Sequence, residues 1–186
     1  MYLFLLPLVL GFASNSAGTF TAVFSHRWSE QRGSIVSVIL RDVLGIPVWG
    51  FGFFLASNTS APVLFAASLI IDLLGWLMVA LGGVIILLAL VTIRVKAVMP
   101  STRDRLVQKG LYAHMRHPIH SGTILEFLGL FLLMPNWPVT VACALGVVWI
   151  FVQTWLEEMD LLQRLPDYHE YMERVHGFYL VFERIS

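Results

Sequence analysis

Long apolar stretches, separated by short polar ones, dominate this chain. Five such stretches can be read from the sequence: residues 1–24, 34–57, 63–95, 119–134 and 139–155. Crossing the hydrocarbon core of a bilayer as a helix takes roughly 18–20 residues that are mostly apolar. The pattern therefore predicts an all-α fold, a polytopic membrane bundle of about five transmembrane helices.

The third stretch is longer than a single upright helix needs. At ~1.5 Å per residue, a helix over 63–95 would reach about 50 Å. Either residues 63–71 form an interfacial piece before the helix, or the helix projects beyond the bilayer. In the second stretch, Gly45 and Pro47 predict a kink.

The last two stretches follow one another closely. Pro135, Asn136, Trp137 and Pro138 join them, which is typical of a tight turn between two helices. We expect an antiparallel helical hairpin, so that the start of the fourth span and the end of the fifth are neighbours. The tail after about residue 159 is mixed polar and aromatic.

Basic residues predict the orientation in the membrane. They concentrate in segments 25–33 and 94–117 and after residue 157, whereas linkers 58–62 and 135–138 contain none. The positive-inside rule then places the N-terminus outside and the C-terminus in the cytoplasm. Because no Lys or Arg precedes Arg27, a retained first span is favoured over a cleaved signal peptide.

Composition agrees with a membrane protein. The chain has 186 residues, of which 58% are hydrophobic and 13% charged, whereas a soluble domain has about a quarter charged residues. We expect one integral membrane domain of a bacterial-type inner or plasma membrane, with N-terminal spans over 1–95 and a functional hairpin and tail over 96–186. The zero net charge gives no reason to expect a nucleic-acid partner. The single cysteine, Cys143, is interpreted as a core residue.

Candidate chemistry gathers at one end of the predicted hairpin. The polar segment before the fourth span and the end of the fifth span carry Tyr112, Arg116, His117, His120, Glu157 and Glu158. Ionisable groups close to the hydrocarbon region are costly, so they indicate function. Glu126, inside the fourth span, also needs a partner, and we expect a structural bond there.

Other kinds of site fit less well. His114, His117 and His120 are spaced by three, which could indicate a metal site, but Pro118 interrupts the helical spacing. Ser121 beside His120 lacks the surroundings of a nucleophile elbow, and no glycine-rich phosphate loop is present. We predict no resident metal.

The motifs Gly110-x-Tyr112-x-x-x-Arg116-His117-Pro118, Glu157-Glu158-x-x-Leu161 and Tyr171-x-x-Arg174-Val175 form a specific combination. It resembles the isoprenylcysteine carboxyl methyltransferases, and the related phospholipid N-methyltransferases share the Arg-His-Pro and Glu-Glu elements. The resemblance covers roughly residues 106–175. It implies an all-helical membrane enzyme that uses S-adenosylmethionine (SAM) to methylate a hydrophobic, membrane-embedded acceptor at the cytosolic interface.

The resemblance also implies roles for individual residues. The cofactor pocket would be formed by Asp104, Leu106, Val107, Tyr112, His117, Pro118, His120 and Glu157. The catalytic candidates are Arg116, His117 and Glu158. A carboxylate at a partly dry boundary favours the sulfonium and ammonium groups of SAM.

The acceptor half departs from the family pattern. Gln153 stands where an arginine associated with the acceptor is usual, and His120 replaces a tyrosine. The acceptor is therefore left open between an isoprenylcysteine-type carboxylate and a lipid head group. An amine acceptor would need a general base, and His117 or His120 are the candidates.

Two alternatives come from other classes of function. The altered acceptor half also suits a non-catalytic subunit or scaffold within a larger membrane complex. A third possibility is a reductase, because some membrane sterol reductases have a related C-terminal architecture.

Overall fold

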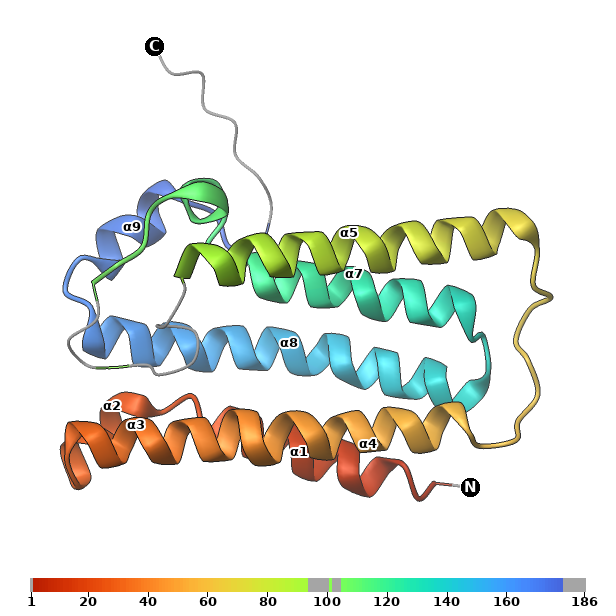
Figure 1. Ribbon diagram of the computed structural model, residues 1–186, viewed down its shortest axis with the longest axis horizontal. Coiled ribbons are helices and arrows are strands. Elements are labelled where there is room, and N and C mark those ends of the chain that lie inside the picture. The colour runs from red at the N-terminus through yellow and green to blue at the C-terminus, as the bar shows by residue number, and fades with distance from the viewer. Residues whose placement is uncertain (1, 94–100, 102–104, 179–186) are drawn as a thin grey trace, which may run out of the picture.

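The computed structural model describes residues 2–93, 101 and 105–178, and these residues form a long helical bundle (Figure 1). Its elements are α1 (Leu5–Ala17), α2 (Thr21–Arg27), α3 (Glu30–Val38), the π-helix η1 (Ile39–Gly45), α4 (Ile46–Ser57), α5 (Leu69–Ile93), the 3₁₀-helix η2 (Gly110–Ala113), α7 (Pro118–Leu133), α8 (Trp137–Arg164) and α9 (Tyr168–Arg174). Within those ranges the only β-type pairing is one isolated bridge between Val63 and Asn136. The predicted all-α fold is confirmed.

Helix length and composition indicate how many segments could cross a membrane. Within the described residues, three helices are long and apolar enough, namely Glu30–Ser57, Leu69–Ile93 and Trp137–Arg164. A fourth span results if α1 and α2, which meet at a bend of 61°, are counted together. α7 is a shorter apolar helix that runs beside them. The prediction of about five transmembrane helices is therefore only approximate.

The predicted C-terminal hairpin is present. Pro118 occupies the first turn of α7, and Asn136 caps α8 by accepting a hydrogen bond from the backbone N–H of Val139 at 3.0 Å. A side-chain oxygen at this position satisfies one of the free N–H groups of the first turn. α8 continues to Arg164, well past the expected end near residue 155, because its last turns are held by an ion pair between Asp160 and Arg164 at 2.5 Å.

α5 resolves the question of the overlong third stretch. The helix begins at Leu69, and the residues just before it are not helical; the backbone N–H of Leu64 donates to the carbonyl of Pro135 at 2.6 Å. This contact ties together the two linkers at the end of the bundle opposite α9 (Figure 1). α5 then packs closely on α7, where an added Cβ at Gly82 would lie 2.5 Å from the carbonyl of Gly122. Small residues of this kind allow close helix contacts in lipid.

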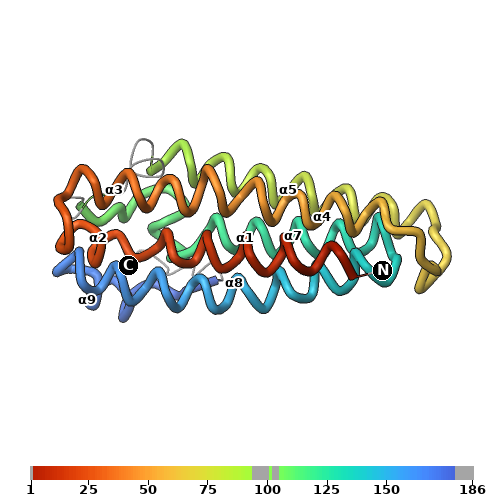
Figure 2. Tube along the Cα trace, turned by 90° about the horizontal axis from the view of Figure 1, so that it is seen from below, coloured from red at the N-terminus to blue at the C-terminus, as the bar shows by residue number. Residues whose placement is uncertain are grey.

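In the N-terminal half, α3, η1 and α4 form one continuous rod alongside α1 (Figure 2). Where a kink was predicted, the chain has the π-helical stretch η1, which ends at Gly45 and is followed by Pro47 in the first turn of α4, and Glu30–Ser57 continues as one helical segment. Polar side chains of α1 bond to its carbonyls: Ser14 donates to Leu40 at 2.8 Å and Asn15 donates to Arg41 at 3.2 Å. These bonds stabilise backbone that does not follow the regular helical pattern.

The two halves are joined along α8. Phe12 of α1 stacks on Trp149 of α8 with ring centroids 4.4 Å apart. Asp160, which is buried, accepts a hydrogen bond from the backbone N–H of Ala22 in α2 at 2.8 Å. Cys143 is buried in the core of this region, as expected. These contacts set the spacing between the N-terminal helices and the C-terminal hairpin.

Candidate active site

The loop before α7 presents Tyr112. Gly110 has φ of +61°, a conformation that residues with a Cβ rarely adopt, and it begins the short helix η2. Tyr171 of α9 donates its hydroxyl to the carbonyl of Tyr112 at 2.6 Å. The loop is therefore fixed by its own glycine and by α9.

Arg116 connects this loop to the segment after α9. Its side chain donates to the carbonyl of Met172 at 3.1 Å and pairs with Glu158 of α8 at 3.0 Å. The backbone N–H groups of Arg116 and His117 donate to the carbonyls of His176 and Gly177. The Arg-His-Pro segment is thus held from two sides.

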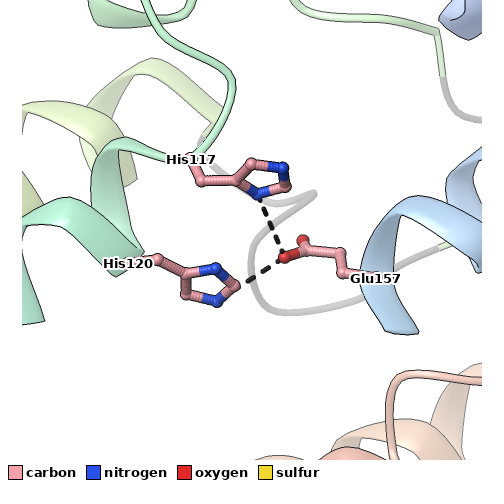
Figure 3. A group of neighbouring side chains, drawn as sticks. All are labelled: His117, His120 and Glu157. Atoms are coloured by element: carbon pink, nitrogen blue, oxygen red, sulfur yellow. Dashed lines mark ion pairs between the residues drawn. The ribbon is translucent and has the colours of Figure 1, made fainter. Parts of the chain in front are cut away.

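His117, His120 and Glu157 come together at the end of the hairpin (Figure 3). The Glu157 carboxylate lies 3.6 Å from Nδ1 of His117 and 3.6 Å from Nε2 of His120. The two imidazole rings are stacked, with centroids 5.4 Å apart. Because Pro118 begins α7, His117 caps this helix and His120 lies in its first turn, so both rings face α8.

His117 is placed to carry a positive charge. Its Nδ1 faces Glu157, and its Nε2 lies 2.8 Å from Glu158. Burial opposes the charged form, but the hydrogen bonds and charges of the two carboxylates outweigh this effect and raise the pKa of His117. Since both ring nitrogens face acceptors, the hydrogen-bonding pattern matches a protonated imidazole.

His120 is placed differently. Its Nδ1 lies 2.8 Å from the hydroxyl of Thr154, and that hydroxyl donates its own proton to the carbonyl of Ile150 at 2.8 Å. Nδ1 must therefore be the donor, which leaves Nε2 of a neutral His120 as an acceptor facing Glu157.

The same three side chains also have the spacing of a metal site. One ligand atom from each of His117, His120 and Glu157 lies within 4.8 Å of the others. Nδ1 of His117 faces Glu157, which would be a ligand of the same metal, and Nε2 of His117 faces Glu158, as in many metal-bound histidines whose second nitrogen donates to a carboxylate. The expectation that no metal is resident therefore stays a prediction.

A cavity of about 510 Å³ opens beside this cluster, within the range typical of small-molecule sites. Of the residues predicted for the site, those that line it are Leu106, Val107, Tyr112, Arg116, His117, His120, Gln153 and Glu157. Pro118 and Glu158 do not line it: Pro118 is buried at the start of α7, and Glu158 lies behind, bound to Arg116 and His117. Asp104 lies outside the described residues.

Three polar atoms of the cavity-lining residues lack partners among the described residues. They are the hydroxyl of Tyr168, Nε of Arg116 and the indole nitrogen of Trp49, all buried. A buried polar group without a partner costs free energy, so these atoms suggest that a ligand supplies the missing bonds.

The tyrosines around the cavity remain neutral. Burial raises the pKa of Tyr171 to about 12, although the charge of Arg116 opposes this. Burial, followed by the charge of Glu157, also raises the pKa of Tyr112 well above its ordinary value. Both phenol groups therefore keep their protons at physiological pH.

The N-terminal half contributes side chains to the cavity that the sequence motifs did not reveal. Thr19, Arg41, Asp42 and Trp49 line its other side. Arg41 and Asp42 form a mutual ion pair at 2.9 Å, and this pair lies on the cavity wall. Their only signal in the sequence was two charges in an apolar stretch.

Gln153 lines the cavity with its amide already engaged. Its oxygen accepts from Ser16 at 2.8 Å, and its nitrogen donates to Thr19 at 2.7 Å. These bonds fasten α8 to α1. The residue in the place of the usual arginine therefore carries no charge into the cavity, and one of its two amide protons is used in the bond to Thr19.

Comparison with known families adds one finding. The family model for phospholipid methyltransferase matches residues 70–166, just over half of the chain, which include the Arg-His-Pro segment and the Glu-Glu pair. No curated protein and no solved structure matches the chain.

Proposed function

The chain belongs to the phospholipid methyltransferase family of membrane proteins, and from this premise we propose that it transfers a methyl group from SAM to a hydrophobic, membrane-embedded acceptor. The observation that carries the proposal is the half-exposed carboxylate of Glu157, which faces a cavity of about 510 Å³ while two histidines hold it in place. The acceptor is an isoprenylcysteine-type carboxylate or a lipid head group.

The residues present suit SAM as a ligand. Glu157 supplies a carboxylate, 40% exposed, for the positively charged part of the molecule. Tyr112, Leu106 and Val107 supply aromatic and apolar surface beside it. The unpartnered hydroxyl of Tyr168 supplies a polar contact. When bound, SAM provides an activated methyl group on a sulfonium.

The other polar residues of the site contribute to catalysis by positioning Glu157. Arg116 and Glu158 hold His117, which in turn holds Glu157. Fixing both reactants in line supplies a large part of the rate in a displacement reaction. Arg116, His117 and Glu158 therefore act mainly by keeping the carboxylate in its working position.

His120 is the better candidate for a general base if the acceptor is an amine. Its ring donates through Nδ1 to Thr154, so Nε2 keeps a lone pair that can accept a proton, whereas both nitrogens of His117 carry protons in the arrangement described above. A carboxylate acceptor would be ionised already and would need no base. The two acceptor classes thus make different demands on His120.

The acceptor enters from the lipid. The cavity is lined by Ile46 and Trp49 of α4 and by Ile86 and Leu90 of α5. In the described part of the chain, α4 packs on α1 and α8, and α5 packs on α7, but no substantial packing joins α4 to α5. An apolar chain can lie between these two helices while its head group meets SAM at the polar end.

The distribution of basic residues suggests the orientation of the protein. We place the polar end of the cavity in the cytoplasm, with the N-terminus outside, in a bacterial-type inner or plasma membrane.

A second candidate is a non-catalytic subunit or scaffold of a membrane complex. The observation in its favour is that both the oxygen and the nitrogen of the Gln153 amide bond to the N-terminal half, at Ser16 and Thr19. In this case the cavity would be a remnant of the family fold, and SAM would not bind.

Calorimetric titration of SAM into the purified protein in detergent tests the proposal. We expect binding by the wild type and a loss of roughly 10- to 100-fold in affinity for Glu157→Gln, since a charge-assisted hydrogen bond contributes about 1.5–3 kcal/mol. Glu170→Gln, which changes an exposed carboxylate of α9, is the matched control and should bind like the wild type. Absence of binding by the wild type would favour the scaffold.

A further inference from the structure

Glu126 is an acidic residue in the middle of α7 whose role is not explained by the proposed donor site. It lines the cavity and is half-buried. The structural bond expected for it is not found: no hydrogen bond or ion pair reaches Glu126 from any residue that the structure describes. A carboxyl group in the hydrocarbon region without a partner is costly.

The surroundings of Glu126 leave space for a ligand. On α5, Gly82 and Gly83 face it; a Cβ added at Gly83 would lie 3.7 Å from the Glu126 carboxylate. The next cavity residues along α5 toward its C-terminal end are apolar, Ile86 and Leu90. The Glu126 carboxyl group is therefore a polar group beside a mostly apolar part of the cavity wall.

A second unpartnered group lines the same cavity from α4. The indole N–H of Trp49 is buried and has no acceptor among the described residues. The two groups are complementary in kind, because a carboxyl oxygen accepts a hydrogen bond and an indole N–H donates one. A hydroxyl is the simplest group that can satisfy either of them, since it both donates and accepts.

The separation between Glu126 and His120 can be estimated because both residues lie on α7. It follows His120 by six residues on the same helix, which corresponds to about 9 Å along the axis. Under the proposed function, His120 lies where the methyl group is transferred. Glu126 is therefore suited to hold a part of the acceptor about 9 Å deeper in the membrane than the reacting atom.

We propose that the acceptor is a hydroxyl-bearing amphiphile and that Glu126 binds this hydroxyl deep in the cavity. The proposal rests on the proposed function, which supplies the position of the reacting atom. A phospholipid whose two chains are both ester-linked has only hydrogen-bond acceptors at that depth, so it could not donate a hydrogen bond to a carboxyl oxygen of Glu126. The hydroxyl thus distinguishes the acceptor from ordinary diacyl lipids.

Two lipids that differ only in one hydroxyl test whether the cavity binds that group. One is 1-oleoyl-lysophosphatidylethanolamine, which has a free glycerol hydroxyl; the other is the same lipid with that hydroxyl methylated. Thermal unfolding of the full-length protein in detergent is measured with each probe at equal mole fraction. We expect the hydroxyl-bearing lipid to raise the Tm of the wild type more than its methyl ether does, by roughly 2–4 °C.

Two variants test whether Glu126 causes the difference between the Tm shifts of the two lipids. In Glu126→Leu the difference between the probes should disappear, whereas in Glu126→Gln, which keeps an acceptor oxygen, part of it should remain. SAM should still raise the Tm of both variants, which shows that they are folded. Equal effects of the two lipids on the wild type, or a preserved difference in Glu126→Leu, would overturn the proposal. Failure of SAM to raise the Tm of the wild type would contradict the proposed function and leave the comparison of the lipids readable.

Discussion

The two ends of the cavity differ in how their polar groups are paired. At the polar end, Glu157 has two imidazoles within 3.6 Å, and Arg116 and Glu158 hold one of them from behind. Deeper in the bundle, Glu126 and the indole N–H of Trp49 have no partners within the described residues. The acidic residue at the polar end is thus paired without a ligand, whereas the acidic residue at the deeper end is not.

This difference suggests two strategies of recognition. The paired end is preorganised: its charges are already oriented, so little must change when a cation binds. The unpaired end gains its hydrogen bonds only with a ligand, so it selects for one that can supply them. A protein that always binds the same donor but must choose among similar lipids would benefit from both.

The largest effect should come from removing the base at the paired end. His120→Gln keeps a side-chain donor for Thr154 but has no basic nitrogen, so methyl transfer to an amine acceptor should fall by about 100-fold or more. Transfer of label from SAM to lipid measures this, and SAM affinity should change little. His169→Gln, at an exposed position on α9, is the control. Unchanged transfer in His120→Gln would show that the two histidines do not have the separate roles assigned to them.

The next largest effect should come from weakening the connection between the N-terminal helices and the C-terminal hairpin. Asp160→Asn removes the charge that faces Arg164, whose side chain is 8% exposed, and weakens the bond to α2. Leaving one partner of a buried ion pair uncompensated typically costs about 3–5 kcal/mol. We expect a clear decrease in Tm on thermal unfolding. Asp167→Asn, at an exposed position just before α9, should change the Tm little; equal Tm values for the two variants would show that Asp160 does not join the halves.

The smallest expected effect is a change of Tm with pH, which arises from His117 at the paired end. Folding raises the pKa of His117, so its contribution to stability is complete below the unfolded pKa of ~6.5 and is lost as the pH rises through the folded value. The Tm should therefore fall as the pH rises above about 6.5. His117→Gln should not show this decrease.

SAM affinity should change in the opposite direction over the same pH range. Deprotonation of His117 removes a positive charge 3.6 Å from Glu157, so the carboxylate should attract a cation more strongly, by roughly fivefold for about 1 kcal/mol. Calorimetric titrations at several pH values measure this change. If stability and affinity rose or fell together, the charge on His117 would not be what links them.

The hairpin and its chemistry could be predicted because both depend on local sequence. Proline and asparagine residues define the turn before α8, and its short length forces α7 and α8 to be neighbours. Once these helices are antiparallel, His117 and His120 must lie near Glu157. Of the residues that carried the family resemblance, six line the cavity: Tyr112, Arg116, His117, Glu157, Leu161 and Tyr171.

The other side of the cavity could not be predicted in the same way. Contacts such as those of Gln153 with Ser16 and Thr19 join residues far apart in the sequence, and helix periodicity does not indicate which helices pack together. The π-helical stretch that carries Arg41 depends on bonds from α1. The absence of a partner for Glu126 is also a property of the packed bundle and leaves no trace in its neighbours in sequence.

The shortness of α7 has a consequence for the surrounding bilayer. Its 16 residues extend about 24 Å, less than the ~30 Å of a typical hydrocarbon core. Lipids beside a short helix are accommodated by local thinning of the membrane. We therefore expect a dimple in the leaflet next to the start of α7, where head groups are drawn inward to the level of His120.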